Sequence, residues 1–222
     1  FHNIKLILMQ KFKSNQYIFE GAKLFSKFNT KKIEELNFIF TTRLINNYNN
    51  LCSNFLFGFL LKSYSFSKYK NNKSKYEVKN INIFNSKKNK FKIFNYCNNL
   101  LTSINFTKDL VSEPANILNP VTYAERCLKL RKTGLKVKVL NMQQITKIGM
   151  GSLLGVSQGS INEPRVVVFE WNLKKNKQPT ILVGKGVTFD TGGISLKPSG
   201  GMEEMITDMG GSAVVVGSMM NA

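Results

Sequence analysis

The chain has 222 residues, of which 42% are hydrophobic, 11% aromatic and 20% charged. This is the composition of an ordinary folded protein and excludes wholesale disorder, and the length leaves room for one domain and part of another. The longest apolar stretches, such as residues 55–61, are far shorter than the roughly 20 residues that span a bilayer. Neither a membrane-spanning segment nor a membrane partner is therefore expected.

The formal net charge of +19 is concentrated in the first half of the chain. Residues 1–100 hold 18 Lys and Arg against 4 acids, whereas residues 101–222 hold 14 against 9. Clustered cations bind nucleic acid or an anionic membrane surface by releasing counterions, which is one explanation. The other is compositional drift, because the same hundred residues contain 18 Asn. No recognised nucleic-acid motif is present, which favours drift.

The cysteines and the chain ends indicate a reducing compartment and a shortened chain. Cys52, Cys97 and Cys127 are too few and too widely spaced for a disulfide framework or a thiolate zinc site. No signal peptide is visible. The chain starts at Phe1 and stops within an apolar stretch, 214–222, so we expect both ends to be cut.

Residues 1–91 are predicted to form a small α/β domain. Its expected elements are a helix or strand edge over 17–27, a strand over 36–42, a helix over 54–62, and exposed edge strands or a loop over 71–90. Residues 92–112 are predicted to be a connecting helix, because apolar residues recur at helical spacing up to Leu110 and Pro114 then limits continuation.

Residues 113–222 are predicted to begin a second domain in which helices and strands alternate. The expected elements are a helix over 121–132 ending at Gly134, a strand over 136–140, a helix over 142–148, a Gly-rich turn, a strand over 165–171, a basic loop over 174–178 and an apolar strand over 180–183. Such alternation is typical of an α/β fold whose parallel sheet has helices on both faces.

A segment rich in glycine and charge, VGKGVTFDTGGISLKPSGGMEEMITDMGG, begins at the carboxyl end of that last predicted strand. Ligands bind at this end of the strands in open α/β sheets. Residues 184–211 place Lys185, Lys197, Asp190 and Asp208 among eight glycines. Glycine allows the backbone to fold closely around a small charged object, so the segment is predicted to carry a binding site.

A metal ion suits this segment better than a phosphate. The sequence matches neither the dinucleotide fingerprint, whose third glycine is replaced by Phe189, nor the nucleotide loop G-x-x-x-x-G-K-[ST]. Asp190 and Asp208 offer carboxylate oxygens, which are ligands for hard or borderline divalent cations. A nearby ammonium could stabilise an oxyanion, whereas a lysine that ligates a metal must be neutral.

Taken singly, each residue has an ordinary structural explanation. Asp190 could be a turn residue, Asp208 a helix cap, and Lys185 and Lys197 exposed loop cations. Their combination and spacing favour the metal site. Two carboxylates and a lysine are too few for a two-metal site, so further acids would have to come from elsewhere.

The segment resembles the leucyl aminopeptidase family (cytosol aminopeptidases), dinuclear metallopeptidases whose motif runs like VGKGVTFDTGGISLKP followed by GMEEM, an Asp and MGG. The resemblance continues upstream and covers roughly residues 109–222. The phrases that carry it are DLVSEPANILNP (109–120), MGSLLGVSQGS (150–160) and EPRVVVFEW (163–171), and FGFLLKSYSFSKYK (57–70) is similar to the end of the family's N-terminal domain. It implies an N-terminal domain (1–91), a connecting helix (92–112) and the start of a mixed-sheet catalytic domain (113–222) with helices on both faces.

The resemblance also implies a role for each site residue. Lys185, Asp190 and Asp208 fall on metal-ligand positions, with Asp190 bridging two ions, and Lys197 falls on the catalytic lysine that polarises the scissile carbonyl. The family's other two acidic ligands and its catalytic arginine lie in an Asn-Thr-Asp-Ala-Glu-Gly-Arg motif, which this chain does not contain. This fragment alone is therefore expected to be inactive.

The implied activity is release of N-terminal residues, with a leucine-type preference, from peptides through a water activated by two divalent ions. Manganese or zinc, with magnesium as a further choice, would serve, and a bicarbonate held by the missing arginine would transfer protons. A cytoplasmic homo-hexamer is expected for the full-length protein. The alternatives are a basic DNA-binding protein of the same family and an inactive remnant.

Overall fold

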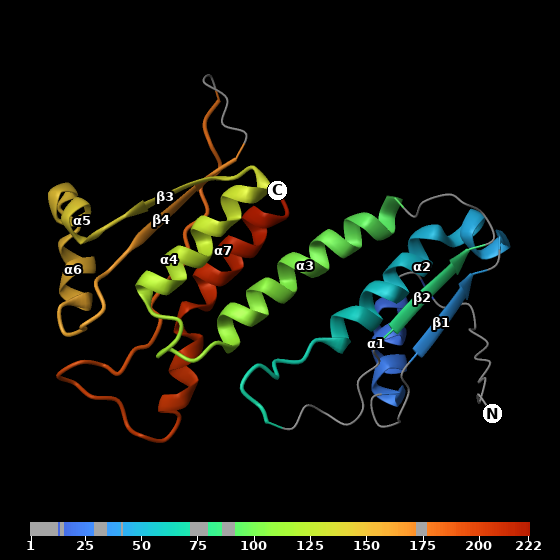
Figure 1. Cartoon of the computed structure of the whole chain (residues 1–222), viewed down its shortest axis with the longest axis horizontal. Helices are drawn as coiled ribbons and strands as arrows, with labels where there is room; N and C mark the ends of the chain where they lie inside the picture. The colour runs from blue at the N-terminus through green and yellow to red at the C-terminus, as the bar shows by residue number, and fades with distance from the viewer. Residues whose placement is uncertain are drawn as a thin grey trace. The chain divides into compact units, whose positions relative to one another are not determined.

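The computed structural model describes residues 13, 16–28, 35–40, 42–71, 80–85, 92–171 and 177–222. The chain divides into two compact units, Phe1–Leu101 and Thr102–Ala222. Each unit combines helices with a two-stranded sheet, so the predicted α/β class is confirmed (Figure 1). No helix in the described ranges is long and apolar enough to cross a bilayer.

The first unit packs two helices against a parallel pair of strands. In chain order the elements are α1 (Tyr17–Phe28), β1 (Glu35–Phe40), α2 (Thr42–Ser63) and β2 (Asn80–Asn85). Alternate residues of the strands, such as Leu36 and its register partner Ile81, pack against a core of Phe25, Phe28 and Phe59. The opposite face of β1 carries Glu35 and Asn37, as the two-residue period of a strand requires.

Helices α1 and α2 touch through their main chains. A Cβ atom on Gly21 would collide with the Phe55 carbonyl oxygen, and one on Gly58 would collide with that of Ile18. Both positions therefore depend on glycine for the absence of a side chain rather than for its backbone freedom.

In the first unit the predicted helices and strands are present, but some of their predicted boundaries differ from the structure. The segment 17–27 is helical, and the strand expected over 36–42 is β1. Helix α2 begins at Thr42, well before the predicted residue 54, because the intervening stretch is rich in Asn, a weak helix former, and hides the helical pattern. Strand β2 lies within the segment 71–90, of which residues 72–79 and 86–90 are outside the described residues.

Helix α3 (Lys92–Ser112) covers the residues predicted to connect two domains. The division between the compact units falls inside this helix, after Leu101. The domain boundaries 1–91, 92–112 and 113–222 therefore remain a prediction.

The second unit is built around helices α4 and α7, which lie side by side in Figure 1. Its elements after α3 are α4 (Pro120–Lys129), the 3-10 turn η2 (Leu130–Thr133), β3 (Lys136–Leu140), α5 (Met142–Ile148), α6 (Gly151–Ser157), β4 (Val166–Glu170), the 3-10 helix η3 (Met202–Met209) and α7 (Gly210–Met220). The core joins α3, α4, β3 and α7 through buried side chains, among them Leu110, Cys127, Val137, Met209 and Val216.

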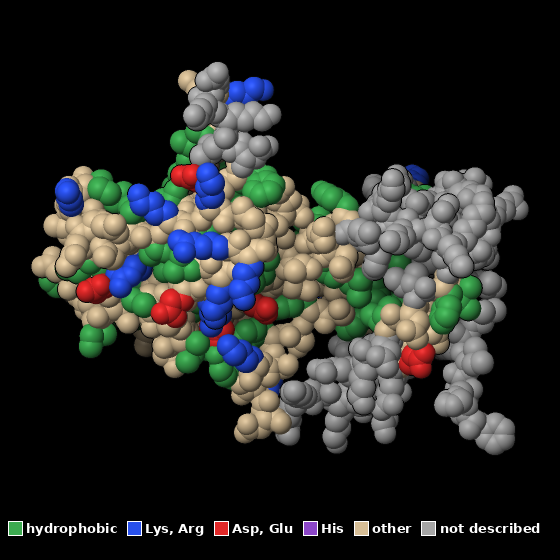
Figure 2. Space-filling view, turned by 45° about the horizontal axis from the view of Figure 1, so that its top comes forward, with side chains coloured by type: hydrophobic (Ala, Val, Ile, Leu, Met, Phe, Trp, Pro, Cys, Tyr) green, Lys and Arg blue, Asp and Glu red, His purple; other side chains and the backbone are tan. Residues whose placement is uncertain are grey.

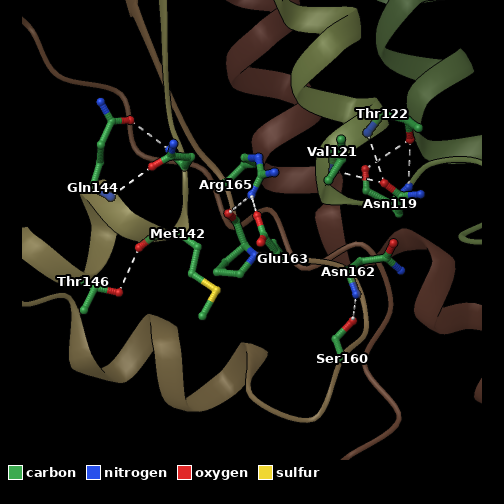
Figure 3. A network of polar contacts seen from close by, with 12 residues as sticks. Asn119, Val121, Thr122, Met142, Gln144, Thr146, Ser160, Asn162, Glu163 and Arg165 are labelled. Carbon is green, nitrogen blue, oxygen red and sulfur yellow. Dashed lines mark hydrogen bonds and ion pairs between the residues drawn. The ribbon is translucent and has the colours of Figure 1, made fainter.

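Short-range caps set the helix ends in this unit. The Asn119 side chain accepts hydrogen bonds from the main-chain nitrogens of Val121 and Thr122, at 3.0 and 3.1 Å, and the Thr122 hydroxyl accepts one from Asn119 N (Figure 3). Asn141 and Gln144 form the same reciprocal box at the start of α5. After η2, Gly134 takes a φ of 93°, which ends the helical segment where predicted.

A buried ion pair joins the end of α3 to α4. Glu113 is 2% exposed, and its carboxylate lies 2.7 Å from the Arg126 guanidinium. The pair between Arg165 and Glu163 differs because the Glu163 side chain is 56% exposed (Figure 3). Loss of one partner should therefore cost more in the first pair than in the second, because it would leave a charge in a buried position.

Three expectations for the second unit are wrong. Strands β3 and β4 pair antiparallel, not parallel. The turn expected after residue 148 contains helix α6. Residues 180–183 form no strand, and Ile181 and Val183 are 75% and 90% exposed. A continuous apolar run is typical of a strand with neighbours on both sides, and in the described part of the chain no strand pairs with it. The basic loop 174–178 lies mostly outside the described residues.

The described surface of the second unit is basic. Figure 2 shows Lys and Arg side chains spread over the part of the molecule that carries α4 and the β3–β4 sheet. The exposed cations there are Lys129, Arg131, Lys132, Lys136 and Lys138. Most cations of residues 1–100 fall outside the described side chains, so the structure adds no support for a nucleic-acid partner.

Candidate metal centre

The Gly-rich segment is held against the start of α7. The Ser212 main-chain nitrogen donates a 2.9 Å hydrogen bond to the Lys185 carbonyl oxygen. A Cβ atom on Gly184 would lie 2.6 Å from the Gly211 carbonyl oxygen, so only glycine permits this approach. The contact brings Lys185, on the loop, to Asp208, near the end of η3.

Lys185 and Asp208 form the first of two ion pairs. The Lys185 Nζ lies 2.6 Å from Asp208 Oδ1, and the Asp208 side chain is only 17% exposed. The other carboxylate oxygen, Asp208 Oδ2, is buried and has no hydrogen-bond partner among the described residues. Burial of an unsatisfied carboxylate oxygen is unfavourable, so such atoms in folded proteins call for a further partner, such as a cation.

Asp190 and Lys197 form the second ion pair, inside a closed loop. The Lys197 Nζ lies 2.7 Å from Asp190 Oδ2 and donates hydrogen bonds to the Asp190 carbonyl oxygen at 3.1 Å and the Met205 sulfur at 3.2 Å. The Gly192 nitrogen donates to Asp190 Oδ1 at 2.9 Å. Gly192 has a φ of 91°, and a side chain there would strike Ser195. The loop therefore fixes Asp190 relative to Lys197.

The charges of both lysines act on Asp190. The hydrogen bond from Lys197 is the largest cause that holds the pKa of the Asp190 carboxyl below its ordinary value, followed by the bond from the Gly192 nitrogen. The positive charge of Lys185 lowers this pKa as well. Lys185 is thus paired with Asp208 and has a weaker electrostatic effect on Asp190, and we refer to the two ion pairs together as the charged cluster.

The structure also tests the ordinary structural explanations of the four charged residues as a turn residue, a helix cap and exposed loop cations. Asp190 does serve as a turn residue, through its bond with Gly192, in addition to its pairing with Lys197. The interpretation of Asp208 as a helix cap is wrong, because Met209 is the N-cap residue of α7 and no side chain caps that end. Lys185, 57% exposed, and Lys197, 36% exposed, are both ion-paired rather than simply solvated.

These residues fit part of a divalent-metal site. Two carboxylates with an oxygen to spare, and an amine that could ligate once neutral, match the ligands of hard or borderline cations. Among the described residues, however, no three His, Cys, Asp or Glu side chains gather into a site. Zinc sites commonly use at least three protein ligands, so these residues account for only part of a ligand set.

Three neighbours of the cluster are not singled out by the sequence: Met205, Ser212 and Tyr123. Met205 contacts Lys197 through its sulfur, and the Tyr123 hydroxyl lies 3.0 Å from Ser212 Oγ. The only feature of the sequence that could have identified these neighbours is the chemistry of their side chains. A tyrosine in a buried helix face needs a partner for its hydroxyl, and a serine at a helix start is a common one.

Comparison with known families shows a match over the second half of the chain. The description "Cytosol aminopeptidase family, catalytic domain" matches residues 105–222. A probable cytosol aminopeptidase of Brucella melitensis is 46% identical over 169 residues, which are 73% of this chain and 35% of that protein. One of Phytoplasma australiense is 46% identical over 179 residues, 79% of this chain and 36% of that protein. The chain spans about a third of the length of these relatives.

Solved structures agree with this match. The bottromycin maturation enzyme BotP in complex with Mn is 26% identical, with a TM-score of 0.75 over 94% of this chain and 44% of BotP. A second BotP structure, 24% identical with a TM-score of 0.72, is similar in fold.

Proposed function

Since this chain belongs to the cytosol aminopeptidase family, we propose that the protein is a metal-dependent aminopeptidase that releases N-terminal residues from peptides, with a leucine-type preference. One observation carries the proposal. Asp208 Oδ2 is buried and has no hydrogen-bond partner among the described residues, while the other oxygen of the same carboxylate is paired with Lys185. That arrangement is suited to binding a cation.

Lys185, Asp190 and Asp208 would hold the metal. Divalent ions held there would supply a water acidic enough to be a nucleophile near neutral pH. Manganese is our first choice, since the similar BotP structure contains Mn, followed by zinc and then magnesium. Lys185 must lose its proton and leave its pairing with Asp208 before its nitrogen can ligate, so metal binding should release a proton and strengthen as the pH rises.

Lys197 would be the catalytic residue that polarises the scissile carbonyl. Its ammonium is oriented by Asp190 and Met205 yet remains 36% exposed, so a substrate oxygen can reach it. A fixed positive charge aimed at a carbonyl stabilises the negative charge that develops there during hydrolysis.

The wider properties of the protein follow from family membership and are proposals too. We propose peptides as substrates, a cytoplasmic location, a homo-hexameric assembly, and a bicarbonate that transfers protons. Because the 222 residues contain no Asn-Thr-Asp-Ala-Glu-Gly-Arg motif, we propose that they bind metal but do not hydrolyse peptides by themselves.

The test is Mn²⁺ binding to the chain, followed by the electron paramagnetic resonance signal of the free ion. Asp208→Asn and Asp190→Asn should each weaken binding at least about tenfold, whereas Glu203→Gln, at an exposed acid on η3, should leave it unchanged. In a protein extended through the missing motif, the Asp variants should also lose leucyl-amide hydrolysis. Full activity in the extended Asp190→Asn variant would remove the assignment of this site.

A further inference from the structure

Ser212 joins the two segments that carry Lys185 and Asp208. Its main-chain nitrogen donates to the Lys185 carbonyl oxygen at 2.9 Å. Its hydroxyl donates to the Met209 carbonyl oxygen at 2.7 Å, one residue after Asp208. A single residue at the start of α7 is therefore bonded to the loop on one side and to the end of η3 on the other.

The direction of the third bond follows from the first two. A serine hydroxyl has one proton, and in Ser212 the Met209 carbonyl oxygen, which can only accept, takes it. The Tyr123 hydroxyl, 3.0 Å from Ser212 Oγ, must then be the donor. The bonds run from Tyr123 to Ser212 and on to Met209.

Tyr123 is well suited to hold this position. It is 7% exposed and belongs to the core that joins α4 to α7. Burial raises the pKa of its phenol well above the ordinary value, so the group stays protonated and remains a donor at neutral pH. Its ring is fixed by packing, and its hydroxyl in turn fixes Ser212.

The packing around Ser212 leaves little slack. A Cβ atom on Gly184 would lie 2.6 Å from the Ser212 α carbon, and one on Gly186 would lie 3.5 Å from Ser212 Oγ. The close approach is therefore at Gly184, before Lys185, whereas a side chain at Gly186 would make only ordinary contact; together with the bond from the Ser212 nitrogen to the Lys185 carbonyl oxygen, it ties the Lys185 main chain to Ser212.

We propose that Ser212, held by Tyr123, is a positioning residue that sets Lys185 relative to Asp208 and so determines how well the site binds a metal. The metal part of this inference rests on the proposed function. The positional part does not, because the bonds are present without any metal.

Thr107, on α3, offers a matched control because its hydroxyl also bonds to α7. The Thr107 hydroxyl of α3 donates to the Ala213 carbonyl oxygen at 3.2 Å, so Thr107→Val also removes a hydroxyl bond to the first turn of α7. Thr107 is a part-buried hydroxyl like that of Ser212, but its proton is shared between the Ser103 carbonyl oxygen of α3, at 3.0 Å, and the Ala213 carbonyl oxygen, and it reaches neither Lys185 nor Met209.

The first measurement is amide hydrogen exchange in the metal-free chain, taken as the rate at residue 212 relative to residue 216 within α7. Tyr123→Phe should raise this ratio about fivefold, the effect of losing one hydrogen bond, and Ser212→Ala, which removes the bonds to both Tyr123 and Met209, should raise it at least as much. Thr107→Val should change it by less than about twofold. The double variant should match Ser212→Ala, because removal of the Ser212 hydroxyl already breaks the bond to Tyr123. Additive effects, or an equal effect of Thr107→Val, would overturn the proposal.

The second measurement is Mn²⁺ affinity. Tyr123→Phe and Ser212→Ala should weaken it about tenfold, as loss of groups that orient metal ligands does, and Thr107→Val should leave it within about twofold. If the unaltered chain binds no Mn²⁺, the metal assignment fails, and the exchange ratio still decides the positional role. If it binds Mn²⁺ and neither variant weakens binding, Ser212 is not a positioning residue.

Discussion

Two stretches of the second unit show what local sequence can and cannot specify. Residues 119–148 contain α4, β3 and α5, and both helices begin at an asparagine whose side chain bonds to main chain only two or three residues away. Residues 177–209 carry the charged cluster, yet before η3 they contain no helix or strand among the described residues, and the contacts that hold them come from distant positions such as Ser212. The first stretch is shaped by its own sequence, the second by its neighbours.

The largest expected effect tests whether the first stretch is as self-sufficient as its caps suggest. Arg126→Met would leave the Glu113 carboxylate without its 2.7 Å partner in a buried position. We expect a loss of about 3–5 kcal/mol in the free energy of unfolding, measured by urea denaturation. Arg165→Met is the control, and because Glu163 is exposed it should lose about 1 kcal/mol or less. Equal losses would show that burial of the pair does not matter.

The next effect concerns the dependence of the second stretch on its neighbours. Gly184→Ala would place a methyl group 2.6 Å from the Gly211 carbonyl oxygen and should cost about 1–3 kcal/mol of stability. It should also weaken Mn²⁺ binding, since the loop must move away from α7. Gly200→Ala, in open space on the same loop, should do neither. Thermal unfolding and Mn²⁺ titration of both variants measure the difference.

A smaller effect is the pH dependence of the unfolding free energy that arises from Cys127, a buried residue of α4. Burial raises the pKa of the Cys127 thiol from 9.0 to about 12, so the folded state keeps the proton that the unfolded chain loses. The stabilisation is fully present below pH 9.0 and is lost as the pH rises toward about 12. We expect a decrease of roughly 1–2 kcal/mol in unfolding free energy by about pH 10.5. The slope should be shallower in Cys127→Ala; an unchanged slope would assign the effect to other groups.

The smallest effect tests a single cap. Asn119→Ala removes the acceptor for two main-chain nitrogens of α4 and should cost about 1 kcal/mol. Asn116→Ala, at an exposed asparagine in the preceding turn, should change stability by less than about 0.5 kcal/mol. Circular dichroism during urea unfolding distinguishes the two. A cap variant as stable as its control would mean that packing alone defines the start of α4.

The same division explains which predictions succeed. Residues 136–140 and 142–148 are predicted to the residue, because alternation and caps are local signals. Residues 180–183 have the composition of a central strand, but a strand exists only where another strand pairs with it. The roles of the four charged site residues remain a prediction from their types and spacing. Their pairing, and the roles of Tyr123 and Ser212, depend on a contact between segments far apart in the sequence.

The charges of the cluster set a limit on what this chain can bind. In the structure two aspartates and two lysines sum to zero, because each carboxylate faces an ammonium. If Lys185 gives up its proton to become a ligand, the cluster carries one net negative charge, the two carboxylates less the remaining ammonium of Lys197. A first divalent cation would already exceed that charge, and a second would be strongly repelled. Electroneutrality therefore leads us to expect one ion per chain, and room for a second only where further carboxylates join the cluster.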